Sequence, residues 1–165
     1  MKHLFIKKSP INGSGLHTKL AFNTNDKIGT IHGDIEIVKK FTPTLAALSW
    51  NWIGVGRYSW INTQHSPFRY INHSCNPNTY IQGKRQVIAL KKIRADEELT
   101  MDYSLTEADP DFWLPGGCSC GSKQCRGIIG PVYSLSHKDF KRLEPIITKR
   151  FKKIFLVELN KRKLA

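Results

Sequence analysis

The chain has 165 residues, enough for one domain with a real hydrophobic core or one domain with an appendage. Hydrophobic residues make up 40% of it, which argues against wholesale disorder, and no run reaches the roughly 20 apolar residues of a membrane-spanning helix. The net charge is +13, and over half of the excess lies in residues 137–165, where ten Lys and Arg stand against three Asp and Glu.

This positive charge has two interpretations. It favours an acidic partner such as nucleic acid, or it belongs to a solvated basic helix that aids solubility. The apolar run within residues 1–8 is too short for a secretory signal. We therefore expect a reducing compartment, the cytosol or the nucleus, with secretion into a host cell as the alternative. In such a compartment clustered cysteines favour a metal over disulfides.

Short strand-like runs dominate the first part of the chain. They are rich in Ile, Val, Tyr and Thr and are separated by Gly, Asn, Asp and Pro, which is typical of strands joined by turns. Residues 82–85 are predicted to be a hairpin turn, and one helix is expected over residues 44–50, directly after Pro43. The predicted strands cover residues 3–7, 27–32, 35–39, 58–61, 79–82, 86–90 and 98–101.

After Tyr103 the pattern changes. Residues 104–117 are acidic and turn-rich and form a predicted connector. A helix is expected from Ser136, because Asp139 three residues later makes a start like a capping box, and Pro145 should break it before a second helix begins. The second helix carries one apolar stripe, which either packs on the body of the domain or forms a dimer or partner surface. The stripe consists of Ile147, Phe151, Ile154, Phe155 and Leu159.

Four cysteines are placed as one plus three. Cys75 lies in a polar turn with the sequence Asn-His-Ser-Cys-Asn-Pro-Asn, residues 72–78, and the other three are Cys118, Cys120 and Cys125. Four thiols are the number that completes a tetrahedral structural zinc site. Such a site would fasten a C-terminal flap to the polar turn around Cys75.

Two further patterns are weaker. Residues 13–15, Gly-Ser-Gly, allow backbone to approach a ligand closely, although a plain turn explains them as well. Tyr103 ends a predicted strand, where its hydroxyl can orient a substrate or its ring can simply pack at the edge.

Together, in this order, these segments resemble the SET-domain protein lysine methyltransferases, from about residue 7 to residue 130. Residues 12–16 look like the family's first glycine motif. Residues 69–78 are similar to its Arg-Phe-x-Asn-His-Ser-Cys-x-Pro-Asn motif, and residues 96–103 to its Gly-Glu-Glu-Leu-Thr-x-Asp-Tyr motif, with Asp in place of Gly. The cysteines at 118–125, followed by Arg-Gly, resemble its post-SET zinc segment.

The resemblance implies a mainly β fold with short helices: small curved β-sheets with a pseudoknot, and here a C-terminal helical extension. It divides the chain into a SET domain (1–105), a connector with the post-SET zinc segment (106–132) and the basic extension (133–165). It implies transfer of methyl groups from S-adenosylmethionine, which leaves S-adenosylhomocysteine, to lysine in a protein substrate, a histone or another basic protein. The catalytic residue would be Tyr103. The cofactor contacts would be Ser14, Gly15, Leu16, Tyr58, Arg69, Asn72 and His73, and one structural Zn²⁺ would bind Cys75, Cys118, Cys120 and Cys125.

The chain departs from the family in two places. Residues 31–34, Ile-His-Gly-Asp, stand where many members have Tyr-x-Gly-Glu, so an aromatic of the lysine channel is missing and the number of methyl groups transferred stays open. All four cysteines are used, so there is no cysteine-rich pre-SET region. The alternative function is a catalytically weak SET-like module that binds chromatin or nucleic acid through residues 137–165. The protein would be a monomer or a homodimer, with no membrane partner.

Overall fold

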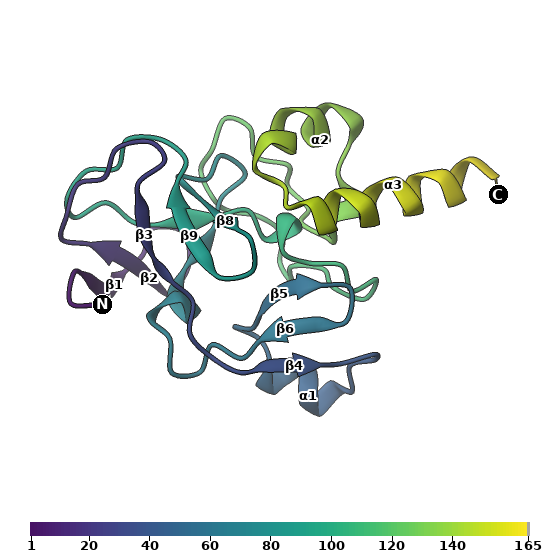
Figure 1. The fold of residues 1–165 in the computed structure, drawn as a ribbon, viewed down its shortest axis with the longest axis horizontal. Coiled ribbons are helices and arrows are strands. Elements are labelled where there is room, and N and C mark those ends of the chain that lie inside the picture. Colours follow the sequence, from purple (N-terminus) through teal and green to yellow (C-terminus); the bar gives the residue numbers. More distant parts are fainter. Residues whose placement is uncertain (165) are drawn as a thin grey trace.

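The computed structural model describes residues 1–164 and the side chains of residues 1–161. Strands make up much of the N-terminal two thirds, and two helices of the C-terminal extension lie together on one side of the molecule, with α3 reaching outward to the chain end (Figure 1). The strands are β1 (Leu4–Lys8), β2 (Ser14–Thr18), β3 (Lys27–Thr30), β4 (Ile35–Ile37), β5 (Ile53–Gly56), β6 (Ser59–Ile61), β7 (Asn72–His73), β8 (Thr79–Gln82), β9 (Gln86–Ala89) and β10 (Thr100–Met101). The α-helices are α1 (Pro43–Leu48), α2 (His137–Leu143) and α3 (Lys149–Leu164), and the 3₁₀ turns are η1 (Pro67–Tyr70), η2 (Tyr103–Leu105), η3 (Val132–Ser134) and η4 (Glu144–Ile146).

Within this described range the strands form small sheets. β1 and β2 are an antiparallel pair, β3, β9 and β8 form one three-stranded sheet, and β4, β6 and β5 form another. The hairpin between β8 and β9 turns at Gly83, whose φ of +66° is the left-handed conformation that glycine adopts without strain. The mainly β fold with short helices is therefore confirmed.

A parallel pair of two-residue strands brings two distant segments together. In this pair β7 lies beside β10, with Asn72 opposite Thr100 and His73 opposite Met101. Asn78 reinforces the contact, because its side-chain oxygen accepts from the Thr100 amide at 2.8 Å. The polar turn and the strand that leads to Tyr103 consequently form one packed unit.

Two groups of buried apolar side chains stabilise the fold. The first lies among the sheets and includes Leu16, Ile61 and Leu99. The second joins Leu105 and Ala108 to the C-terminal helices. Its helical members include Phe151, which is 1% exposed, so the apolar stripe packs on the body of the domain and does not form a free surface. The extension thus shares a core with the connector.

The helix boundaries follow the caps expected from the sequence. Ser136 caps α2, because its side chain accepts a hydrogen bond from the Asp139 amide at 3.0 Å. Pro145 lies in the 3₁₀ turn η4, which separates α2 from α3, and α3 begins at Lys149. The helix predicted over residues 44–50 is α1, with Thr42 as its cap. The predicted extension ends at residue 165, which lies outside the described residues.

Each predicted strand overlaps an observed one, with ends that differ by at most two residues, and residues 79–82 match β8 at both ends. The predictions omitted β2, β5 and β7. β2 contains Gly15, where an added Cβ would lie 2.3 Å from Oε1 of Glu98. The Glu98 side chain therefore leaves room only for glycine at this position of the strand. A glycine-rich strand resembles a turn when only the sequence is considered.

No helix in the described part of the chain is both long and apolar enough to cross a membrane.

Candidate active site and metal centre

Asn72 ties the polar turn to the glycine-rich loop. Its Nδ2 lies 3.2 Å from the Asn12 carbonyl oxygen, 3.2 Å from that of Ser14 and 2.8 Å from Oε1 of Glu98. Ser9 donates its hydroxyl to the same Glu98 carboxylate at 2.8 Å. Glu98 therefore anchors both Asn72 and the start of the loop, and the predicted cofactor segments 12–16 and 72–73 lie next to each other.

Tyr103 begins η2 beside His73. Its hydroxyl donates to the Ile71 carbonyl at 2.9 Å, and its ring meets the His73 ring edge-on, with centroids 5.3 Å apart. Burial raises the pKa of Tyr103 to about 12. The phenol is consequently neutral at physiological pH, with its hydroxyl held in one direction.

Two hollows meet at Tyr103. The first has a volume of about 90 Å³ and includes Arg69, Trp52 and Phe112 in its wall. The second, of about 180 Å³, includes Asn72, His73 and the segment from Leu114 to Cys120. Both are lined by Asn12, Trp50, Tyr103 and Leu114. Groups entering from either hollow would therefore reach a wall that contains Tyr103.

Arg69 has an unused donor beside the first hollow. Its Nη1 donates to the Gln64 carbonyl at 3.0 Å, whereas its Nε is buried without a hydrogen-bond partner in the described part of the chain. A buried unpaired donor costs free energy, and a bound anionic group would satisfy it. The carboxylate of an amino-acid-like cofactor fits this position, and nearby Asn12 and Asn72 offer polar backbone and side-chain groups.

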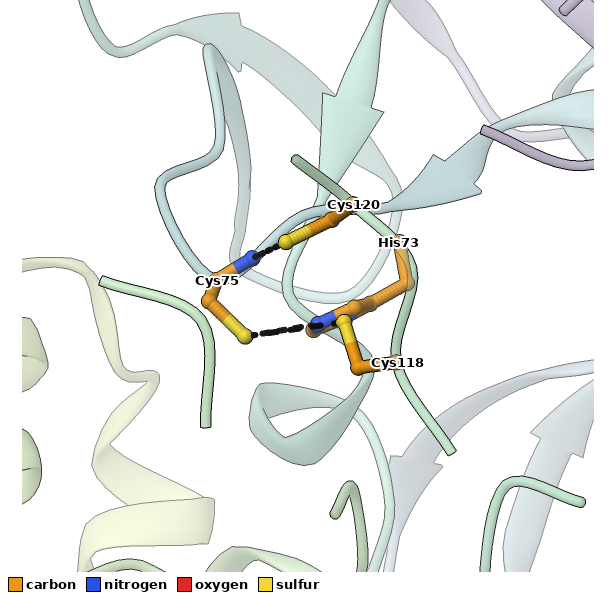
Figure 2. Close-up of side chains that lie close together, drawn as sticks. All are labelled: His73, Cys75, Cys118 and Cys120. Carbon is orange, nitrogen blue, oxygen red and sulfur yellow. Dashed lines mark hydrogen bonds between the residues drawn. The ribbon is translucent and has the colours of Figure 1, made fainter. Parts of the chain in front are cut away.

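A cluster of sulfur and nitrogen atoms lies behind the second hollow. One ligand atom from each of four residues, His73, Cys75, Cys118 and Cys120, falls within 4.8 Å of the others (Figure 2). The Cys75 and Cys118 sulfurs are 3.8 Å apart, and the Cys75 amide lies 3.5 Å from the Cys120 sulfur. No disulfide joins the cysteines of the described chain. Clustered free thiols at this spacing fit a zinc ion.

Cys125 stands outside that group, although it was predicted as the fourth thiolate. Its thiol is exposed and lies 3.5 Å from the Cys118 carbonyl oxygen. The structure instead brings in His73, which was predicted as a cofactor contact. Zinc binding by four cysteines thus stays a prediction. Cys75, Cys118 and Cys120 lie together, and Cys125 lies beside Cys118.

The hydrogen bonds of His73 decide which of its nitrogens carries the proton. Its Nδ1 accepts from the Tyr103 amide at 3.2 Å, so the neutral ring is protonated at Nε2, which lies 3.2 Å from the Cys75 sulfur. Burial lowers the pKa of His73 to about 4, so the ring is neutral at physiological pH. A protonated Nε2 donates to a sulfur and does not bind a metal, which favours His73 as a support for Cys75.

Thiol acidity within the cluster is uneven. Burial raises the pKa of Cys75 to about 11 and raises that of Cys118 further. At Cys120 burial acts in the same direction, but hydrogen bonds from the Cys75 and Ser122 amides outweigh it and lower the pKa to about 7. The buried thiols would therefore ionise readily only beside a cation, which is the setting that a zinc ion provides.

Sequence reasoning missed one buried ion pair. Arg126 directs both Nη atoms to the carboxylate of Asp102, at 2.6 and 2.7 Å, and its amide lies 3.3 Å from the Cys75 sulfur. The Asp102 side chain is fully buried, and it also accepts from the Ser104 amide. Arg126 therefore links the cysteine segment to the turn that carries Tyr103. Both residues belong to the motifs quoted above, and that membership was the only indication in the sequence that they have a role at the site.

The remaining predicted cofactor residues differ in position. Ser14 and Gly15 lie in β2 beside the Asn72 amide, and Leu16 turns its side chain into the core, where it is fully buried. Tyr58 lies at the exposed turn between β5 and β6, with 47% of its surface accessible, and is not among the residues lining either hollow at Tyr103. The structure therefore does not bring Tyr58 to the site.

Comparison with known proteins agrees with this geometry. Residues 13–104 match the family model of the SET domain, which covers more than half of the chain, so the protein belongs to the SET-domain family. A solved structure, that of KRYPTONITE in complex with mCHH DNA, H3(1-15) peptide and SAH, superposes with a TM-score of 0.58 at 19% identity. The superposition covers 77% of this chain and 29% of that one, and it supports the fold.

Curated relatives carry names of histone-lysine methyltransferases. "Histone-lysine N-methyltransferase, H3 lysine-36 specific" from Chaetomium globosum is 28% identical over 74% of this chain and 15% of its own length. "Histone-lysine N-methyltransferase ash1" from Drosophila melanogaster is 30% identical over 72% of this chain and 6% of its own. The human "Histone-lysine N-methyltransferase 2B" is 40% identical over 37% of this chain and 2% of its own. The chain thus spans only a small part of these relatives.

Proposed function

We propose that the protein transfers methyl groups from S-adenosylmethionine to the side-chain amine of lysine in a protein substrate. The observation that carries the proposal is the position of Tyr103, which lines both hollows and whose hydroxyl is held by the Ile71 carbonyl. One hollow would take the cofactor and the other the lysine side chain. Membership of the SET-domain family supports the same reaction.

The cofactor supplies an electrophilic methyl group on a sulfonium when it is bound. Asn72 and His73 would line the cofactor in the second hollow. Arg69 lies in the wall of the first hollow, so its unpaired Nε would meet the cofactor carboxylate where the two hollows adjoin at Asn12. Backbone around Ser14 and Gly15, held by the Asn72 amide, would border the cofactor. Leu16 would contribute backbone only, because its side chain is in the core.

The lysine amine must be neutral to attack a methyl group, although its ordinary pKa is about 10.4. Apolar and aromatic walls of the first hollow, among them Trp52, Ile53 and Phe112, would lower that pKa by excluding water. Glu107 lines the same hollow, but its oxygens already accept from the Trp60 indole and from the amides of Ala108 and Asp109. Tyr103 would therefore orient the amine, and no strong general base is needed.

A single structural Zn²⁺ would bind Cys75, Cys118, Cys120 and Cys125. It would fix the segment from Leu114 to Cys120 as one wall of the second hollow. Because the same ion would hold Cys75 beside His73, metal binding and closure of the cofactor hollow would be coupled. Free thiols in this arrangement also favour a reducing compartment, the nucleus or the cytosol.

Histones are the substrates that the relatives' names suggest, and we propose a histone or another basic nuclear protein for this chain. The decisive experiment incubates wild type, Tyr103→Phe and Tyr80→Phe with S-adenosylmethionine and either histones or whole-cell lysate. Mass spectrometry then reports the substrate, the lysine and the number of methyl groups. Tyr80 is the control because it lies on β8 outside both hollows.

The expected result is methylation by wild type and Tyr80→Phe, with a loss of about 10²-fold or more for Tyr103→Phe, the scale on which a slightly misplaced reacting group slows a reaction. Absence of transfer to every protein mixture would overturn the proposal. So would a Tyr103→Phe variant that retains full activity.

A further inference from the structure

Arg142 joins the C-terminal extension to the metal centre. It lies near the end of α2, outside the stretch that matches the SET family, and its Nη1 donates to the backbone carbonyl of Cys75 at 3.2 Å. The residues lie 67 positions apart in the chain. A side chain of the extension therefore contacts the segment that carries the buried cysteine.

The guanidinium of Arg142 is held in place from its own helix. Its Nη2 lies 3.0 Å from the Asp139 carboxylate, whose other oxygen accepts from the Ser136 hydroxyl at 2.6 Å. Ser136 caps the same helix. Because the guanidinium is planar, fixing Nη2 at Asp139 also sets the direction of Nη1. Arg142 therefore loses little further side-chain entropy when Nη1 binds the Cys75 carbonyl.

Cys75 is contacted through each of its polar atoms. Its amide faces the Cys120 sulfur, its own sulfur accepts from the Arg126 amide, and its carbonyl oxygen accepts from Arg142. The residue is fully buried. The first two contacts come from the cysteine segment itself and would loosen with it, whereas the third comes from a helix anchored independently in the second core by Leu143.

We propose that Arg142 is a positioning residue for the zinc centre, through which the C-terminal extension slows metal release. The proposal rests on the zinc site proposed above but not on methyl transfer. By fixing the Cys75 carbonyl, Arg142 would keep the sulfur in place when Cys118 or Cys120 moves. The extension would thus act as a third support of the cluster, in addition to the polar turn and the cysteine segment.

A general stabilising effect of the extension is the competing explanation, and Arg150 separates the two. Its Nη1 also donates to a backbone carbonyl of the domain body, that of Val55, at 2.6 Å. Val55 lies in β5 and is not part of the sulfur cluster. Arg142→Ala and Arg150→Ala therefore each remove one arginine-to-carbonyl bond between extension and body, but only the first removes a bond to Cys75.

The experiment measures zinc release from the full chain into a colorimetric chelator, without cofactor or substrate. Wild type is expected to hold one zinc per chain and Arg142→Ala to release it about ten-fold faster, the scale of losing one hydrogen bond from a charged donor. Arg150→Ala should release it at the wild-type rate. Arg142→Lys keeps the charge, but a single ammonium group cannot bind Asp139 and the Cys75 carbonyl together as the planar guanidinium does. Its release rate should therefore lie between those of wild type and Arg142→Ala.

Equal rates for Arg142→Ala and wild type would overturn the proposal, as would equally fast release from Arg150→Ala or a wild-type chain that binds no zinc. If Arg142→Ala does not fold, Arg142→Lys decides, and a wild-type rate for it counts against the proposal. If the variants release zinc at the expected relative rates but wild type methylates nothing, only the proposed activity is refuted, because the release assay requires no turnover.

Discussion

Arg126 and Asp102 form a bidentate ion pair, and Asp102 directly precedes Tyr103 in the chain. The guanidinium nitrogens lie 2.6 and 2.7 Å from the two carboxylate oxygens, and the Asp102 side chain is fully buried. The pair crosses from the cysteine segment to η2, the turn in which Tyr103 lies. Loss of one partner would leave a charge buried without compensation.

Arg126→Ala should lower the free energy of unfolding by about 3–5 kcal/mol, because Asp102 would then be buried unpaired. Urea unfolding measures the change. The control is Lys152→Ala, which removes the partner of Glu144 in a pair whose side chains are 31% and 52% exposed. That loss should stay below about 1 kcal/mol. Equal effects of the two substitutions would show that the buried pair carries no special stability.

Tyr103 should ionise only well above the ordinary pKa of tyrosine. Unfolded tyrosine has a pKa of about 10, and burial raises the pKa of Tyr103 to about 12. Between these two pKa values Tyr103 is ionised only in the unfolded chain. The free energy of unfolding should therefore fall as pH rises above 10, whereas below pH 10 Tyr103 should add no pH dependence to it. Phenolate absorbance after a rapid pH jump reports the titration.

In that experiment Tyr103→Phe should lack the late step of the titration and should lose less stability above pH 10 than wild type does. A wild-type titration in which every tyrosine has the ordinary pKa of about 10 would contradict the buried phenol. The same result would weaken the role given to its hydroxyl.

The fourth zinc ligand can be identified by cobalt substitution. If Cys125 binds the metal, the thiolate-to-cobalt absorption of wild type should be that of four thiolates, and Cys125→Ser should reduce it. His73→Gln should keep the absorption but weaken metal affinity by about 10–100-fold, because the ring would support Cys75 without binding the ion. Reduced absorption is therefore expected from the cysteine substitution alone. A spectrum of three thiolates in wild type would assign the fourth place to His73.

Local chemistry explains which parts of the fold could be predicted. Ser136, Pro145 and Pro43 each act on a few neighbouring residues, and the helix ends follow them closely. The motif around Asn72 and Tyr103 was available from resemblance alone, and the structure then shows why the two residues are near each other, through the pairing of β7 with β10.

Contacts between distant segments explain what could not be predicted. Glycine is needed at position 15 of β2 because Glu98 fills the space that a Cβ would take, and nothing near residue 15 in the sequence indicates that neighbour. Arg126 and Arg142 reach partners far away in the chain, so their roles depend on how the segments pack. Tyr58 was placed by its interval from Asn72, which does not determine where a turn points.

The C-terminal extension should be essential for folding, because its helix α3 completes the second core. Phe151→Ala should lower the free energy of unfolding by about 3–5 kcal/mol, since the side chain is 1% exposed. Leu156→Ala on the same helix is the matched control, because Leu156 is 51% exposed, and its effect should stay within about 0.5 kcal/mol. Similar losses in urea unfolding would contradict the packing of α3.

Nucleic-acid binding by the extension must accordingly be tested through charge and not by deletion of residues 137–165, which would remove part of the core. Lys149 and Lys153 are exposed on α3, one turn apart. If the extension binds DNA, affinity should fall as salt rises, and Lys149→Glu with Lys153→Glu should weaken binding and flatten that salt dependence. Because both side chains are exposed, stability should be unchanged. A wild-type chain without salt-dependent DNA binding would exclude the binding-module alternative and leave the basic helix as a solvated face.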